Sequence, residues 1–136
     1  MNSIGLAFAG AAETLIGAPF RLHGRDPATG LDCVGLVASA LDAIGRVHSA
    51  PRAYALRNLS HEPFLPALKS AGFSACEEPL RAGDLLLANP SAGQVHLAIA
   101  AKNPGFIHAH ASLGRVVHTP PPLNWPILGR WRLHND

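Results

Sequence analysis

Cys33, His96 and His108 are residue types that together could support nucleophilic catalysis. A cysteine nucleophile needs a base within hydrogen-bond reach, and the base needs a third group to orient it. Both histidines lie in apolar stretches typical of strands, and side chains on neighbouring antiparallel strands can touch. We therefore expect His96 to be the base or ion-pair partner of Cys33, and His108 to orient it. The alternative is that the histidines are core residues and that the cysteine only packs.

The residues around Cys33 predict a thiol at the start of a buried helix. Turn-forming residues fill positions 24–30, the residues from Cys33 to Ile44 are apolar at nearly every position, and Gly45 follows. This pattern is typical of a central helix of about three turns that ends at the glycine. Free amide N–H groups and the positive end of the dipole at a helix N-terminus favour a thiolate. We therefore expect a lowered pKa for Cys33.

The histidines also allow a different chemistry. His108 and His110 lie two residues apart on one face of a strand and could offer two ligands to zinc, with His96 as the third. No acidic or cysteine ligand with convincing spacing accompanies them, so we expect neither a metal nor another cofactor. The other histidines fall in loops or near the ends of elements and are expected at the surface: His23, His48, His61, His118 and His134.

The elements that must position these residues are helices followed by strands. A first helix is expected from about Ser3 to Ile16, and a short one from Ser60 to about Ala71. Asn103-Pro104-Gly105 is a hairpin signal that would place the strands of His96 and His108 side by side. The order of elements predicts a single α+β domain over 1–136, with an antiparallel sheet of about five strands. The expected strands are 85–88, 94–101, 106–110, 115–118 and 128–133.

Composition limits the classes of function. The chain has 136 residues, of which 48% are hydrophobic and 15% charged, so one domain with a real core is expected. The net charge of +2 is too small and too scattered to indicate nucleic-acid binding. The mild basic cluster at 130–132 is expected to be a solvated strand. Cys33 and Cys76 have no CxxC or zinc-like spacing, and we expect both to be free thiols, with Cys76 inert.

The N-terminal residues do not match a signal peptide well. Residues 4–12 are apolar, but no Lys or Arg precedes them and Glu13 follows at once, which continues a helical pattern. We therefore expect synthesis in the cytoplasm without an export signal. No stretch of the sequence is long enough to span a membrane.

Five segments of the sequence, at 16–21, 31–37, 81–86, 94–99 and 106–109, carry motifs. These motifs resemble those of the NlpC/P60 family, whose members are papain-like cysteine peptidases of the bacterial cell wall. Residues 16–21 and 31–37 are similar to the family pattern Gly-x-Pro-Tyr, a glycine-containing loop, then Asp-Cys-Ser-Gly-Leu-Val. Residues 81–86 resemble its Pro-Gly-Asp-Leu strand, and residues 94–99 its His-Val-Gly-Ile strand. Residues 106–109 resemble the strand with the third catalytic residue, a second His. The resemblance runs from about position 11 to position 117.

The resemblance implies a papain-like fold, in which N-terminal helices pack on the sheet and the nucleophile begins the central helix. It implies that Cys33 is the nucleophile, His96 the general base and acid, and His108 the orienting third residue. The backbone N–H of Cys33 would hold the oxyanion. Asp32 matches the family's acidic residue beside the cysteine, which in relatives pairs with the free amine of a peptide stem.

Two positions depart from the family pattern. Phe20 stands where the family usually has Tyr, and Tyr54 could supply the missing hydroxyl. Val34 stands where Ser is usual, which removes a polar group beside the nucleophile. Both changes bear on substrate choice, and we expect Asp32, Phe20 and Tyr54 to contact substrate.

The function implied by the resemblance is hydrolysis of peptidoglycan by a cysteine endopeptidase. The substrate would be a stem peptide, cleaved at the bond between γ-D-glutamate and the diamino acid through a thioester acyl-enzyme. An amidase or acyltransferase with the same Cys-His pair is one alternative, and a catalytically silent wall-binding or tail structural module is another. A bare domain without an export signal resembles short peptidases encoded with phage tails or gene-transfer particles. Baseplate proteins of a virion-like particle would then be partners.

Overall fold

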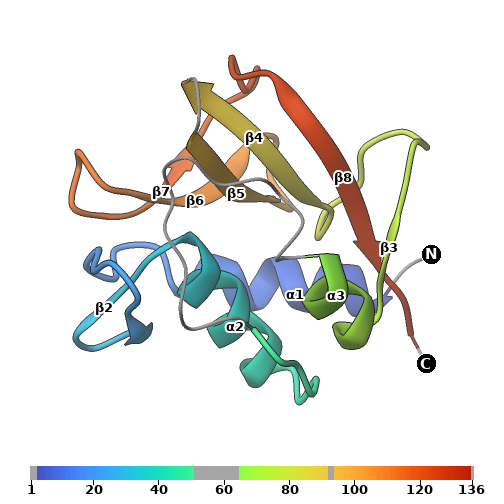
Figure 1. Ribbon diagram of the computed structural model, residues 1–136, viewed down its shortest axis with the longest axis horizontal. Coiled ribbons are helices and arrows are strands. Elements are labelled where there is room, and N and C mark those ends of the chain that lie inside the picture. The colour runs from blue at the N-terminus through green and yellow to red at the C-terminus, as the bar shows by residue number, and fades with distance from the viewer. Residues whose placement is uncertain (1–2, 51–64, 92–93, 136) are drawn as a thin grey trace.

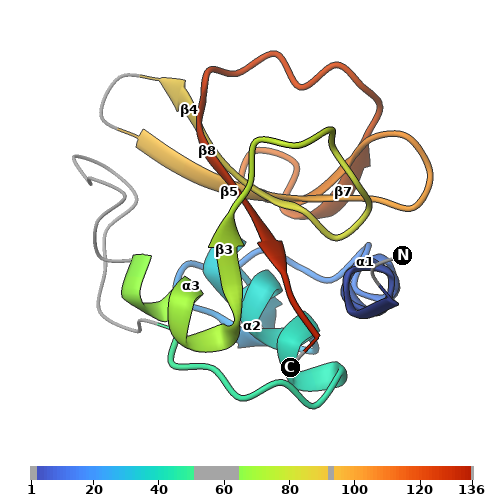
Figure 2. The ribbon, with the colours of Figure 1, turned by 90° about the vertical axis from the view of Figure 1, so that its right-hand side faces the viewer.

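The structure, a computed structural model, describes residues 3–50, 65–91 and 94–135. In these described ranges there are three helices. They lie against one side of an antiparallel sheet, as the two ribbon views show (Figure 1, Figure 2). Within the described ranges, no helix has the length and apolar character needed to cross a membrane. The helices are α1 (Ser3–Thr14), α2 (Cys33–Ala43) and α3 (Leu65–Ala71).

The main sheet has six strands in the order β3-β8-β4-β5-β6-β7, and every neighbouring pair is antiparallel. A separate pair, β1 (Arg25–Asp26) and β2 (Gly30–Leu31), lies just before α2. The last strand, β8, lies between β3 and β4. The first and last strands of the main sheet in sequence order are therefore neighbours in space. The six strands are β3 (Phe73–Ala75), β4 (Leu85–Ser91), β5 (Gln94–Ala100), β6 (Phe106–His110), β7 (Arg115–Thr119) and β8 (Ile127–Leu133).

The predicted α+β class is confirmed, with differences at the edges. The sheet contains one strand that the sequence did not predict, β3. It has three residues, which is too short for an alternating pattern to be recognised in the sequence. Helix α1 ends at Thr14 rather than Ile16, because the N–H groups of Leu15 and Ile16 bond three residues back, to Ala12 and Glu13. The expected first turn of the third helix, at 60–64, lies outside the described residues.

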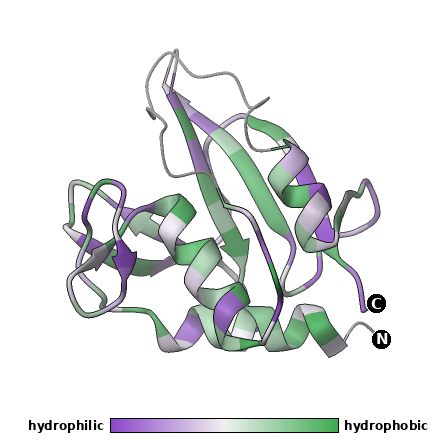
Figure 3. Cartoon of the chain, turned by 60° about the horizontal axis from the view of Figure 1, so that its bottom comes forward, coloured by the Kyte–Doolittle hydropathy of each residue, from purple (hydrophilic) through white to green (hydrophobic). Residues whose placement is uncertain are grey.

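The core lies between the helices and one face of the sheet. Figure 3 shows that apolar residues, coloured green, predominate along the helices that pack against the sheet. Alternating residues of β5, namely Val95, Leu97 and Ile99, belong to this core. Because side chains alternate along a strand, His96 lies on the opposite face, and a smaller cluster covers that face. That cluster contains Leu86, Ala98, Ala100 and Phe106, with Leu123 packed against it.

Arg130 and Arg132 do not form a solvated basic strand, so that expectation is wrong. Arg132 is buried, and its Nε and Nη2 atoms donate to the two oxygens of Asp84 at 2.8 and 2.9 Å. Arg130 donates to the same carboxylate at 2.7 Å. A buried carboxylate requires such partners. The pair therefore fixes the start of β4 against β8.

Candidate active site

Cys33 is the first residue of α2, at the junction between loop and helix that the sequence predicts. Asp32 is the N-cap, and its Oδ1 atom accepts a hydrogen bond from the Gly35 N–H at 2.8 Å. This is the contact expected of an aspartate at that position. Cys33 is 1% exposed and Asp32 is fully buried. The thiol is therefore held at the helix start by a capped first turn.

The loop before the helix is held against the same turn. The second oxygen of Asp32, Oδ2, accepts from the backbone N–H of His23 at 2.8 Å. His23 has a φ of 61°, in the left-handed region, and Gly24 packs so closely on Gly35 that a Cβ on Gly35 would clash with the Gly24 carbonyl. Asp32 thus joins the loop at 20–24 to the start of α2. The predicted contact of Asp32 with a substrate amine stays a prediction, and such an amine would have to compete with these two N–H donors.

The environment of the Cys33 thiol opposes the thiolate. Burial raises the pKa of Cys33 to about 12, and the neighbouring Asp32 carboxylate adds to the rise. The backbone amides of Leu97, Val34 and Cys33 itself act in the opposite direction, toward a lower pKa. The expected lowering of the pKa by the helix N-terminus is therefore wrong for this structure, because the cost of removing a charge from water is larger.

His96 and His108 lie side by side on β5 and β6, as the hairpin signal predicts. The strands pair at Ile99↔Ile107, and the Nε2 atom of His96 is 3.0 Å from the Nδ1 atom of His108. The other ring nitrogen of His108, Nε2, is 2.8 Å from the hydroxyl oxygen of Thr119 on β7. The three side chains form one hydrogen-bonded row across three strands.

Trp125 covers this row from the connector between β7 and β8. Its ring meets the rings of His96 and His108 edge to face, at centroid distances of 5.3 and 5.4 Å. Burial lowers the pKa of His96 to about 3, with repulsion from His108 and His110 adding to the shift. Burial likewise lowers the pKa of His108 to about 4, with a contribution from His110. Both rings are therefore neutral near pH 7.

Thr119 and Trp125 are residues that the sequence analysis did not single out. Thr119 ends β7, and Trp125 lies in the proline-rich segment between β7 and β8. The sequence signal for Trp125 is a large aromatic residue in a segment otherwise made of Pro, Leu and Asn. Binding and catalytic residues often lie on loops that a rigid scaffold positions.

Cys33, His96 and His108 line one pocket, of about 140 Å³. Phe20 lines it too, so one predicted substrate contact lies in the same pocket as Cys33. Asp32 is not among the lining residues, and Tyr54 lies outside the described residues. The remaining lining residues are Pro90, Gln94, Ala109, His110, Ala111, Ser112 and Trp125.

The described residues do not bring together a metal-binding set. Within 3–50, 65–91 and 94–135, no group of three or more His, Cys, Asp or Glu side chains is placed to hold a metal ion. The facing nitrogens of His96 and His108 are at hydrogen-bond distance from each other. Both cysteines are free, Cys33 buried and Cys76 half-buried.

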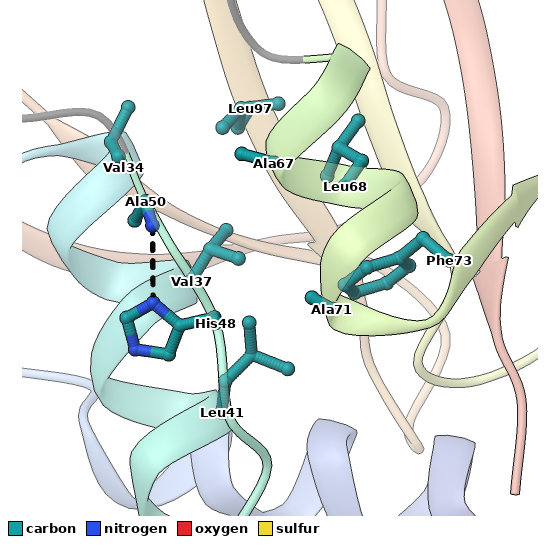
Figure 4. Close-up of a pocket in the computed structure, with 10 residues that line it drawn as sticks. All are labelled: Val34, Val37, Leu41, His48, Ala50, Ala67, Leu68, Ala71, Phe73 and Leu97. Atoms are coloured by element: carbon teal, nitrogen blue, oxygen red, sulfur yellow. Dashed lines mark hydrogen bonds between the residues drawn. The ribbon is translucent and has the colours of Figure 1, made fainter. Parts of the chain in front are cut away.

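A second, apolar pocket lies between α2 and α3 (Figure 4). Val34 and Leu97 line it, and each follows directly after Cys33 or His96 in the sequence. His48 also lines this pocket and is half-buried, with its Nε2 atom 2.8 Å from an Asp42 oxygen, so the expectation of a surface position is wrong for this histidine. Val34, which stands where the family usually has Ser, therefore faces this apolar pocket.

Solved structures with the same architecture support the fold. NlpC1 from Trichomonas vaginalis matches with a TM-score of 0.74 and 18% identity over 99% of this chain, and the match spans 45% of the length of that protein. The P60 domain of an antigen from M. avium subspecies paratuberculosis matches with a TM-score of 0.63 and 20% identity, covering 98% of each chain. This chain therefore corresponds to less than half of the first relative and to the whole of the second.

A third structure is similar in sequence as well. The NlpC/p60 domain of the peptidoglycan hydrolase SagA matches with a TM-score of 0.57 and 28% identity, over 85% of this chain and 88% of that domain. No curated protein matches the sequence significantly. The sequence profile of the NlpC/P60 family matches residues 17–123, a span that contains the nucleophile candidate and both histidines. The chain belongs to the NlpC/P60 family, which includes peptidoglycan hydrolases.

Proposed function

We propose that the protein is a cysteine endopeptidase that cleaves peptidoglycan stem peptides at the bond between γ-D-glutamate and the diamino acid. The observation that carries this proposal is the pocket shared by Cys33, His96 and His108, with the thiol at a helix start and the two imidazoles 3.0 Å apart. A nucleophile, a base and an orienting group in one pocket are the requirements of covalent acyl transfer. Membership of a family that includes peptidoglycan hydrolases supports the choice of substrate.

The row of hydrogen bonds supports a specific role for the ring nitrogens of His96. If Nε2 of His96 donates to His108 and Nε2 of His108 donates to Thr119, the Nδ1 atom of His96 carries a lone pair. That nitrogen is the base in the proposed reaction. The opposite arrangement of protons would leave a hydrogen on Nδ1 and no base for the thiol.

The proposed reaction starts from a neutral thiol and a neutral imidazole. As the Cys33 sulfur attacks the substrate carbonyl, the thiol proton moves to Nδ1 of His96, and the carbonyl oxygen becomes an oxyanion that the Cys33 N–H stabilises. His96 then gives the proton to the leaving amine, and the C–N bond breaks to leave a thioester. Water, deprotonated by His96, attacks the thioester; the acid product leaves and the thiol regains its proton.

The test is digestion of purified peptidoglycan by the native protein and by Cys33→Ala, with mass analysis of the fragments and labelling of new amino groups. An endopeptidase releases fragments with a new amine on the diamino acid, whereas an amidase frees the whole stem from the sugar. An acyltransferase would join the acyl group to an added amine. If neither protein releases fragments while both are folded, the proposed hydrolase activity is wrong, and a wall-binding or structural role replaces it.

A further inference from the structure

His110 is a histidine in the active-site pocket to which the proposed reaction gives no role. It ends β6, two residues after His108, and therefore lies on the same face of the strand. It is half-buried and lines the pocket that contains Cys33 and His96. The centroids of the His108 and His110 rings are 5.6 Å apart.

The backbone of the following turn fixes the tautomer of His110. The Leu113 N–H donates to the Nδ1 atom of His110 at 3.1 Å, and the Gly114 N–H donates to the His110 carbonyl at 2.8 Å. A backbone N–H cannot accept a hydrogen bond, so Nδ1 must carry the lone pair and Nε2 the proton. The turn at 110–114 therefore holds the ring so that Nε2 is its donor atom.

The donor atom of His110 has no partner in the part of the chain that the structure describes. A second donor lies in the same pocket: the Oε1 atom of Gln94 accepts from the Ser91 hydroxyl at 2.7 Å, which leaves the amide NH₂ of Gln94 to bind another group. Among the described lining residues there is no Asp, Glu, Lys or Arg. The pocket thus presents N–H donors, which complement an acceptor group and not an ammonium group.

We propose that His110, assisted by Gln94, binds the free α-carboxylate of the γ-linked glutamyl residue whose carbonyl Cys33 attacks. This inference rests on the proposed function. A γ-glutamyl amide leaves its α-carboxylate unblocked, separated by three carbon atoms from the attacked carbonyl carbon, so the anion enters the pocket with the reacting group. Hydrogen bonds to a carboxylate are shorter and stronger than those to a neutral amide. His110 therefore selects substrates with a free carboxylate at this position.

The test compares two synthetic peptides that differ only at that position, one with the α-carboxylate and one with the α-carboxamide. The native protein should favour the carboxylate peptide about tenfold in kcat/KM, since charge-assisted hydrogen bonds are about twice as strong as neutral ones. His110→Ala should reduce the preference to about twofold or less, through a higher KM for the carboxylate peptide rather than a lower kcat. His110→Gln, which restores an N–H donor, should recover part of the preference. The matched control is His118→Ala, an exposed histidine of β7, which should keep the native preference.

Binding measured without cleavage separates this inference from the proposed function. Calorimetry with Cys33→Ala and with Cys33→Ala/His110→Ala gives the dissociation constants of both peptides. A carboxylate preference that is present in the first protein and lost in the second supports the subsite even if no cleavage is seen. An equal affinity of Cys33→Ala for the two peptides, or a preference that survives loss of His110, overturns the inference while leaving the proposed hydrolysis to its own test.

Discussion

The Nε2 atom of His96 lies 3.0 Å from the Nδ1 atom of His108, and the other nitrogen of His108 lies 2.8 Å from the Thr119 hydroxyl. This row couples the proton position on His96, the proposed base, to a hydroxyl two strands away. A ring that is held in one tautomer by its neighbour is a common way to keep the base ready for proton transfer. The predictions below follow from this row and from the burial of the groups around it.

The first prediction separates His108 from His110. His108→Ala should lower kcat about 100-fold, because His96 then loses the acceptor that keeps its proton on Nε2. His110→Ala should leave kcat within about twofold and act on KM instead. Steady-state kinetics on a stem peptide measures both. A large fall in kcat for His110→Ala with little effect of His108→Ala would mean that the third residue is His110.

The second prediction concerns Thr119 as a positioning residue. Thr119→Val keeps the shape of the side chain but removes the oxygen that is hydrogen-bonded to His108, so kcat should fall about three- to tenfold, the value of one hydrogen bond. Thr119→Ser should restore most of the activity. A role limited to packing predicts the reverse order, since Val fills the space of Thr better than Ser does. Equal activity of the Val and Ser variants would show that the hydroxyl of Thr119 does not contribute to catalysis.

The third prediction concerns the reactivity of the two thiols. Because Cys33 is 1% exposed and burial raises its pKa to about 12, its alkylation by iodoacetamide should be slow near neutral pH and should accelerate up to the highest pH at which the protein stays folded. Half-buried Cys76 should be modified first. Peptide mapping after timed alkylation measures both rates. Fast modification of Cys33 with a plateau near neutral pH would show a thiolate in the resting protein.

The fourth prediction is a loss of stability in acid. The pKa values of His96 and His108 fall from 6.5 to about 3 and about 4, so between these values and 6.5 the unfolded chain binds protons that the folded chain does not. The free energy of unfolding should therefore decrease as the pH falls through 6.5 toward 4, by an amount on the order of a few kcal/mol. Urea unfolding at several pH values measures this slope. His108→Gln should flatten it, whereas His118→Gln, at an exposed site, should not.

Much of the site could be predicted because its elements carry local signals. The turn-rich loop, the apolar run and Gly45 mark the limits of α2, and this places Cys33 at a helix start. The hairpin signal at 103–105 predicts the pairing of β5 and β6, from which the contact between His96 and His108 follows. These are short-range patterns, and the structure confirms each of them.

Other features depend on contacts between segments far apart in the sequence. The pKa of Cys33 was predicted in the wrong direction because the helix N-terminus is a local feature, while the burial that outweighs it comes from the packing of α2 against the sheet. Thr119 and Trp125 come to the histidines from β7 and the connector after it, with no pattern that marks them. A solvated position was predicted for Arg132 because its partner, Asp84, is 48 residues away in the sequence and no local pattern marks the contact.

The phage-tail or gene-transfer-particle type, the particle partners and the site of action remain predictions from the sequence. They depend on the surroundings of the protein rather than on its fold. Identification of the proteins that copurify with it from a native source would test them.

The most direct test of the central claim is a search for the acyl-enzyme by intact-protein mass spectrometry. The native protein is mixed with a γ-D-glutamyl stem peptide and quenched in acid at short times, with Cys33→Ala as control. The account predicts a transient adduct with the mass of the acyl fragment, located on Cys33 by peptide mapping and absent from the variant. Peptide cleavage without any adduct, or an adduct or cleavage that persists in Cys33→Ala, would contradict the claim that Cys33 is the nucleophile.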